Sequence, residues 1–192
     1  MNYFESDISF SASVESISLI ALRQYEKLKR IQVDSDNKNY SSVNGILFNK
    51  DKTILICYPR DKDLETYNVP FCVTKIGNNS FYFCHNLISI NISENVIIIG
   101  RGAFFGCSGL ENINIEGKLN SIEDSAFSSC INLKKFILKS NEPPNIASNA
   151  FIGCNNDFKI YVPSGSVEAY KNSEVWKEYA NNIFGENEKE DK

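Results

Sequence analysis

Six cysteines carry the most reactive side chains of this chain, and four of them return at a nearly constant interval. The four are Cys84, Cys107, Cys130 and Cys154. A zinc site needs paired ligands, as in C-x-x-C, that converge on one point, and the chain has no such pair. A cysteine at one position of a repeated unit instead predicts a buried free thiol that packs as a small hydrophobic group. Cys57 and Cys72 lie outside this series, and a disulfide between them stays open.

Few other residues suggest catalysis. His85 is the only histidine and follows Cys84 in a polar turn. Its equivalents in the other units are Ser108, Ile131 and Asn155. A nucleophile needs a base within hydrogen-bond reach, and nothing in the sequence marks such a partner for His85. Glu123 and Asp124 are adjacent rather than paired across a cleft, and there is no Gly-rich phosphate loop. We therefore expect a non-enzyme without cofactor or metal, with an enzyme of unrecognised type as the weakest alternative.

The element that must position these residues is a repeat. Phe81, Phe104, Phe127 and Phe151 lie 23, 23 and 24 residues apart, and the cysteines keep this spacing. A period in the twenties predicts a solenoid, in which each unit buries its apolar face only by stacking on its neighbours. Each unit ends in an alternation such as Ile90 and Ile92, which is typical of a strand. Upstream, Asp124 or Ser125 is a candidate cap for a single helical turn.

The repeated motif reads I-x-x-x-A-F-x-x-C-x-x-L-x-x-I-x-I, and it resembles the BspA-like leucine-rich repeats of microbial surface and secreted proteins. Residues 44–59 resemble the hairpin insert that such arrays often carry, and residues 160–176 resemble their closing segment. The resemblance implies an α/β-type leucine-rich repeat solenoid, with right-handed coils of a short strand plus a short helix or turn. It covers most of residues 17–184. It is specific for fold and weak for function, because one fold hosts many unrelated sites.

We predict five segments along the chain. They are an N-terminal arm and degenerate first repeat (1–33), a β-hairpin insert (34–70), four leucine-rich repeats (71–163), a C-terminal capping helix (164–185) and a disordered tail (186–192). The degenerate repeat rests on Leu22, Tyr25, Leu28, Ile31 and Val33, which align with the regular motif. The hairpin rests on alternating runs at 45–49 and 53–58, and Trp176 is expected to pack within the cap.

Composition limits the function further. The formal net charge of −4 argues against a general nucleic-acid binder, which would need a basic face. No apolar run reaches the length that a bilayer requires, so no membrane span is predicted. Residues 1–18 lack a basic region and a continuous apolar stretch, so no signal peptide is visible.

Strand alternation predicts a candidate binding surface. If Ile90 and Ile92 point inward, Ser89 and Asn91 point outward, and the same holds along the array from Arg30 and Gln32 onward. The candidate partner-binding residues are Lys135, Ile137, Lys139, Lys159, Tyr161, Asn91, Asn112 and Asn114. The set changes from small and neutral to basic and apolar along the chain. The alternative is a merely solvated strand face.

These observations favour a non-enzymatic module that binds a protein or glycan through its strand face. The 44–58 hairpin is a second candidate site, since insertions in solenoids often carry binding. The family resemblance implies adhesion or host-surface contact, at the cell surface or in secreted form. The alternative is an intracellular scaffold or interaction protein, which the unpaired thiols and the missing signal peptide favour.

Overall fold

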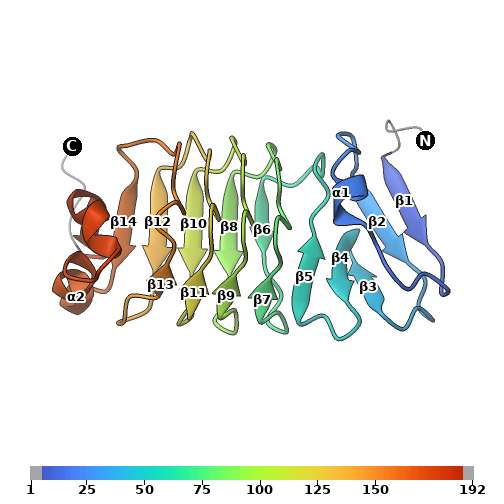
Figure 1. Ribbon diagram of the computed structural model, residues 1–192, viewed down its shortest axis with the longest axis horizontal. Helices are drawn as coiled ribbons and strands as arrows, with labels where there is room; N and C mark the ends of the chain where they lie inside the picture. Colours follow the sequence, from blue (N-terminus) through green and yellow to red (C-terminus); the bar gives the residue numbers. More distant parts are fainter. Residues whose placement is uncertain (1–5, 188–192) are drawn as a thin grey trace.

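The computed structural model describes residues 6–187, and its strands stand side by side along one long axis (Figure 1). One line of strands forms a sheet of six, here called the long-strand sheet. Its members are β6 (Thr66–Asn68), β8 (Ser89–Ile92), β10 (Asn112–Ile115), β12 (Lys135–Leu138), β14 (Lys159–Val162) and β15 (Ile183–Gly185). All neighbours in it are parallel.

A second line of strands forms a sheet of seven, the short-strand sheet. It contains β3 (Tyr40–Val43), β4 (Ile46–Asn49), β5 (Ile54–Cys57), β7 (Lys75–Ile76), β9 (Ile98–Ile99), β11 (Ser121–Ile122) and β13 (Asn145–Ile146). The first three strands are antiparallel neighbours, and from β5 onward the pairing is parallel.

The register of the long-strand sheet, and of the short-strand sheet from β7 onward, equals the sequence period. Ile90 pairs with Ile113, Ile113 with Phe136 and Phe136 with Ile160, which are steps of 23, 23 and 24 residues. Backbone hydrogen bonds such as Lys139 N–H to the Ile115 carbonyl, at 3.0 Å, join each coil to the one before it. The predicted repeat solenoid is therefore confirmed.

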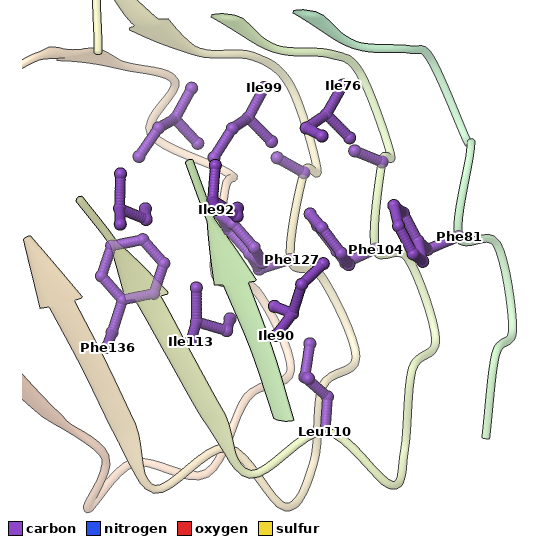
Figure 2. Close-up of a cluster of buried hydrophobic side chains, with 14 of the residues drawn as sticks. Ile76, Phe81, Ile90, Ile92, Ile99, Phe104, Leu110, Ile113, Phe127 and Phe136 are labelled. Carbon is purple, nitrogen blue, oxygen red and sulfur yellow. The ribbon is translucent and has the colours of Figure 1, made fainter. Parts of the chain in front are cut away.

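A row of stacked rings fills the core between the two sheets. The ring centroids of Phe81 and Phe104 are 4.7 Å apart, those of Phe104 and Phe127 5.1 Å, and those of Phe127 and Phe151 5.4 Å. Figure 2 shows Phe81, Phe104 and Phe127 of this row together with Ile90, Ile113 and Phe136 from the strands. The rings of Phe104 and Phe127 are each stacked between two of their repeat equivalents, so the same residue type suits successive coils.

The Ala-Phe pairs lie in non-helical turns. The prediction that Asp124 or Ser125 caps a helical turn is therefore wrong. Ser125 and Ser129 both have a left-handed backbone (φ +53° and +62°), and Gly102 and Gly106 do so in the coil before (φ +57° and +71°). Two reversals of this kind within a few residues are incompatible with right-handed helical geometry. Phe83 adopts the same conformation (φ +56°) and lies so close that a Cβ on Gly106 would be 3.0 Å from its ring.

The repeated cysteines do more than fill space. The thiol of Cys107 donates to the Phe81 carbonyl at 2.9 Å, that of Cys130 to Phe104 at 3.2 Å, and that of Cys154 to Phe127 at 3.1 Å. Each thiol thus satisfies a carbonyl of the preceding coil. Cys84, Cys107 and Cys130 are buried as predicted, whereas Cys154 is only half-buried. Cys57 and Cys72 are both free thiols, which answers the open question of their pairing.

The N-terminal region contains an ordered strand rather than a fraying arm. β1 (Asp7–Phe10) pairs in parallel with β2 (Arg30–Val33), again 23 residues later. Between them, α1 (Leu19–Leu22) is capped by the Ser18 hydroxyl. β2 does not join the long-strand sheet, and this region has a hydrophobic cluster of its own around Leu28, Ile31 and Leu47. Residues 1–5 lie outside the described residues.

The array resumes earlier than the predicted boundary at residue 70. β6 lies within the predicted insert, and its Tyr67 pairs with Ile90, 23 residues later. Tyr67 packs against Phe81 at 6.0 Å between ring centroids, so it begins the same core. This unit was missed from the sequence alone because Tyr67 stands where the motif has isoleucine.

The predicted single helix over 164–185 is wrong. The segment forms η1 (Ser164–Ser166), α2 (Val167–Lys171), η2 (Trp176–Asn182) and the strand β15, which pairs in parallel with β14. Side chains of these short elements donate hydrogen bonds to backbone carbonyls of the last coil, and one continuous helix does not form. Tyr170 donates to the Ser140 carbonyl at 3.0 Å, Trp176 Nε1 to Pro144 at 2.7 Å and Asn182 to Phe158 at 2.8 Å.

The predicted disordered tail begins too early. Glu186 donates its N–H to the Val162 carbonyl at 2.9 Å and pairs its carboxylate with Lys139. The rest of that prediction, residues 188–192, lies outside the described residues.

We expect Trp176→Ala to lower the free energy of unfolding by about 3–5 kcal/mol, because Trp176 is fully buried and closes the last coil. Trp176→Phe keeps most of the apolar area but removes the donor to Pro144, so a smaller loss of about 1–3 kcal/mol is expected. Thermal and urea unfolding measure both, with the exposed Lys177→Ala as the matched control. An unchanged melting temperature for Trp176→Ala would disprove the capping role.

We expect thiol reactivity to follow position in the array. Cys72 is exposed and should react at once with a thiol reagent, and Cys154 more slowly. Burial raises the pKa of Cys107 well above its ordinary value and that of Cys57 to about 12, so neither forms a reactive thiolate at neutral pH. Timed labelling with Ellman's reagent, with and without denaturant, measures this. Fast labelling of Cys107 in the native protein would contradict it.

Candidate functional site

Residues alternate between buried and half-exposed along the long-strand sheet. In β8, β10, β12 and β14 the second and fourth residues are buried and the first and third are half-exposed. Asn91, Asn114, Ile137 and Tyr161 therefore form one row across the sheet, and Asn112, Lys135 and Lys159 form another. Arg30 and Gln32 do not belong to this face, because β2 pairs with β1 instead.

The C-terminal part of this face combines aromatic and cationic groups. Tyr161 lies in register with Phe184 of β15, and the two ring centroids are 6.2 Å apart. The ammonium of Lys159 lies 5.5 Å from the centroid of the Phe184 ring, within cation–π range. We call Lys135, Ile137, Lys139, Lys159, Tyr161 and Phe184 the C-terminal patch.

Phe184 was missed because residues 164–185 were predicted to be one helix. Only as part of β15 does its side chain come beside Tyr161. A signal existed in the sequence: Ile183 and Gly185 lie 23 residues after Ile160 and Val162, as the period requires. The strand β15 thus adds one more outward aromatic residue to the surface.

The N-terminal part of the face is occupied by amide groups that bond to one another. Asn91 donates to the Asn68 side chain at 2.6 Å, and Asn114 donates to Asn91 at 3.5 Å and to Glu116. These amides already use part of their hydrogen-bonding capacity within the protein. The C-terminal patch therefore offers the larger apolar contact, whereas the asparagine row offers a polar flank.

Lys139 of the C-terminal patch forms an ion pair with Glu186. Lys139, which follows β12, places its Nζ 3.2 Å from a Glu186 carboxylate oxygen just beyond β15. Both side chains are partly accessible to solvent, so the pair contributes little to stability and is screened by salt. It nevertheless reduces the positive charge that Lys139 presents to a partner.

His85 does have a partner, which the sequence did not mark. Its Nδ1 lies 2.7 Å from the hydroxyl of Ser108, the equivalent residue of the next coil. Burial and the nearby Arg60 lower the pKa of His85, so the imidazole is neutral at pH 7. No carboxylate contacts this histidine within residues 6–187, and the pair lies at an exposed turn above an open groove of about 730 Å³ that Glu65 and Glu111 also line. This arrangement lacks the orienting third group of a hydrolytic triad.

Two properties of the described part of the chain bear on ligands and membranes. Over residues 6–187, no cluster of three or more His, Cys, Asp or Glu side chains is arranged to hold a metal ion. Over the same range, no helix has both the length and the apolarity needed to cross a bilayer.

Comparison with solved structures shows the same architecture in bacterial proteins. A leucine-rich cell surface protein from Faecalibacterium prausnitzii matches with a TM-score of 0.74 and 27% identity, over 96% of this chain and 49% of that one. A leucine-rich repeat protein from Eubacterium ventriosum matches with a TM-score of 0.68 and 30% identity, over 84% and 43%. The pneumococcal vaccine antigen PcpA, at 22% identity and a TM-score of 0.62 over 94% and 56%, shows the fold alone.

The chain spans about half the length of the Faecalibacterium and Eubacterium proteins. No curated protein matches it. The family model for the BspA type leucine-rich repeat region matches residues 56–175 in six copies. The coils, their register and this match together show that the chain belongs to the BspA type leucine-rich repeat family.

Proposed function

We propose that the protein is a non-enzymatic binding module that holds a protein partner through the C-terminal patch. The observation that carries this proposal is the group of Lys159, Tyr161 and Phe184 on the solvent side of adjoining strands. Tyrosine and other large rings anchor interfaces, because they offer wide contact area at a low cost in side-chain entropy. Strands of a stacked array hold them rigidly, which limits the entropy lost on binding.

Charge favours an acidic partner. The whole chain carries a formal net charge of −4, yet Lys135 and Lys159 lie in register on β12 and β14. A local basic patch on an acidic molecule steers a negatively charged surface toward that patch and repels it elsewhere. The ion pair between Lys139 and Glu186 reduces the positive charge that Lys139 adds to this patch.

The size of the face requires contacts from elsewhere. Six strands at ~4.8 Å spacing and about 10 Å of width give on the order of 290 Å², compared with ~800 Å² per partner in a standard interface. A tight complex therefore also uses neighbouring surfaces, such as the β4–β5 turn or the cap. Otherwise several copies bind together and gain strength by multivalency.

Adhesion at a cell surface is the setting that we infer for this binding. The support is the family membership and the Faecalibacterium relative, which is described as a cell surface protein. A glycan ligand on the same patch, or a scaffold role inside the cell, are the competing functions. The first predicts binding to a sugar probe, and the second predicts no exposure on intact cells.

We expect binding to depend on the C-terminal patch. The probes are a panel of immobilised acidic extracellular-matrix proteins and a glycan array. Tyr161→Ala and Phe184→Ala should each weaken binding to a protein probe about tenfold or more, which corresponds to ~1.4 kcal/mol. Lys159→Glu should weaken it further and flatten its salt dependence. Ser89→Ala, on the same sheet but outside the patch, is the matched control and should change affinity less than twofold.

Thermal melting checks that each variant is folded, which the partial exposure of Tyr161 and Phe184 favours. Equal and negligible effects of all variants would move the site to the 44–58 segment. Binding only on the glycan array would overturn the protein-partner proposal.

We expect antibody labelling of intact, non-permeabilised cells, because adhesion requires exposure. A known internal protein is the control for membrane integrity. Labelling that appears only after permeabilisation would remove adhesion and favour the scaffold.

A further inference from the structure

The last cysteine of the repeated series differs from the others in access. Cys84, Cys107 and Cys130 are at most 1% exposed, whereas Cys154 is half-buried. It lines an open cavity of about 450 Å³ beside the cap, together with Gly153, Phe158 and Tyr179. A small solute can therefore reach the region of one thiol in this series while the others remain enclosed.

The neighbouring thiol lies one coil away in the same orientation. Cys130 and Cys154 hold equivalent positions, and their coils are in register through Phe136 and Ile160. Each sulfur donates to the carbonyl of a stacked phenylalanine, at 3.2 Å and 3.1 Å. Adjacent coils are ~4.8 Å apart, and a disulfide accepts Cα separations of about 4.4–6.8 Å. The stacking distance is therefore within the range that a disulfide requires.

The two sulfur atoms also affect one another. The neighbouring Cys130 thiol lowers the pKa of Cys154, and the same interaction, with burial, raises the pKa of Cys130. The thiolate is the form of cysteine that reacts with peroxides. The more accessible member of the pair is thus also the one whose thiolate is favoured.

We propose that Cys154 and Cys130 form an oxidisable pair, a modification site in which a peroxide attacks Cys154 and Cys130 resolves the product as a disulfide. In the first step the Cys154 thiolate attacks one oxygen of hydrogen peroxide, the O–O bond breaks, and a sulfenic acid and hydroxide form. In the second step the Cys130 sulfur attacks the sulfenic sulfur, and its proton and the hydroxyl leave as water. The sum is two thiols and one peroxide giving one disulfide and two waters.

The geometry predicts which cysteines take no part. The pairs Cys84–Cys107 and Cys107–Cys130 have the same coil spacing, but all three residues are buried away from an oxidant. Cys72 is exposed but holds no place in the repeated series, so its oxidation would stop at an adduct or an intermolecular bond. The reaction is independent of what binds the C-terminal patch.

The test uses the full chain with Cys72→Ser, which removes the exposed thiol outside the pair. The protein is treated with hydrogen peroxide and mapped by mass spectrometry without reduction. We expect one intramolecular disulfide, Cys130–Cys154, forming at least about tenfold faster than any modification of Cys107. Adding Cys130→Ser should stop the reaction at a Cys154 sulfenic acid that dimedone traps, and adding Cys154→Ser should abolish the disulfide.

Thermal melting reveals whether a second substitution impairs folding. Even then, the Cys72→Ser protein alone tests whether the Cys130–Cys154 disulfide forms. Direct conversion of Cys154 to sulfinic acid without a disulfide would overturn the pairing. Oxidation of Cys107 at the same rate as Cys154 would overturn the role of access.

Discussion

Every coil of this protein is completed by its neighbours, and this mutual dependence governs the rest of the structure. Backbone bonds such as Lys139 to Ile115 join consecutive coils, and the stacked rings of Phe81, Phe104, Phe127 and Phe151 run along the same axis. The cysteine thiols add a third set of contacts to the preceding coil. A single coil could satisfy none of these groups alone, so stability comes from the stack rather than from any one unit.

Such a stack must end, and each end solves the problem differently. At the C-terminal end, Tyr170, Trp176 and Asn182 donate to carbonyls of the last coil that no further coil would satisfy. The cap therefore works through side-chain donors that satisfy these carbonyls, and it does not need to be one continuous helix. At the N-terminal end, the chain instead builds a small separate cluster around Leu28 and Ile31, with β1 and β2 as its own sheet.

Because the inward positions are fixed by the stack, the outward positions are free to serve binding. The same strand that finishes the long-strand sheet, β15, also brings Phe184 beside Tyr161. Closure of the fold and assembly of the C-terminal patch thus depend on one segment. The contact between His85 and Ser108 has a related origin, since a residue in a solenoid lies next to its own repeat equivalent.

The sequence by itself determined the solenoid, its period, its inward and outward residues and the burial of three repeated thiols. These follow from local spacing, because a residue type that returns at a constant interval must occupy equivalent positions in stacked coils. Tertiary structure alone decided the features that lack such spacing or that depend on distant contacts. The cap breaks into short turns because its donors must meet the carbonyls of the last coil, which no helical periodicity encodes. Phe184 reaches Tyr161, and Cys154 differs from Cys130, only because of where the array stops.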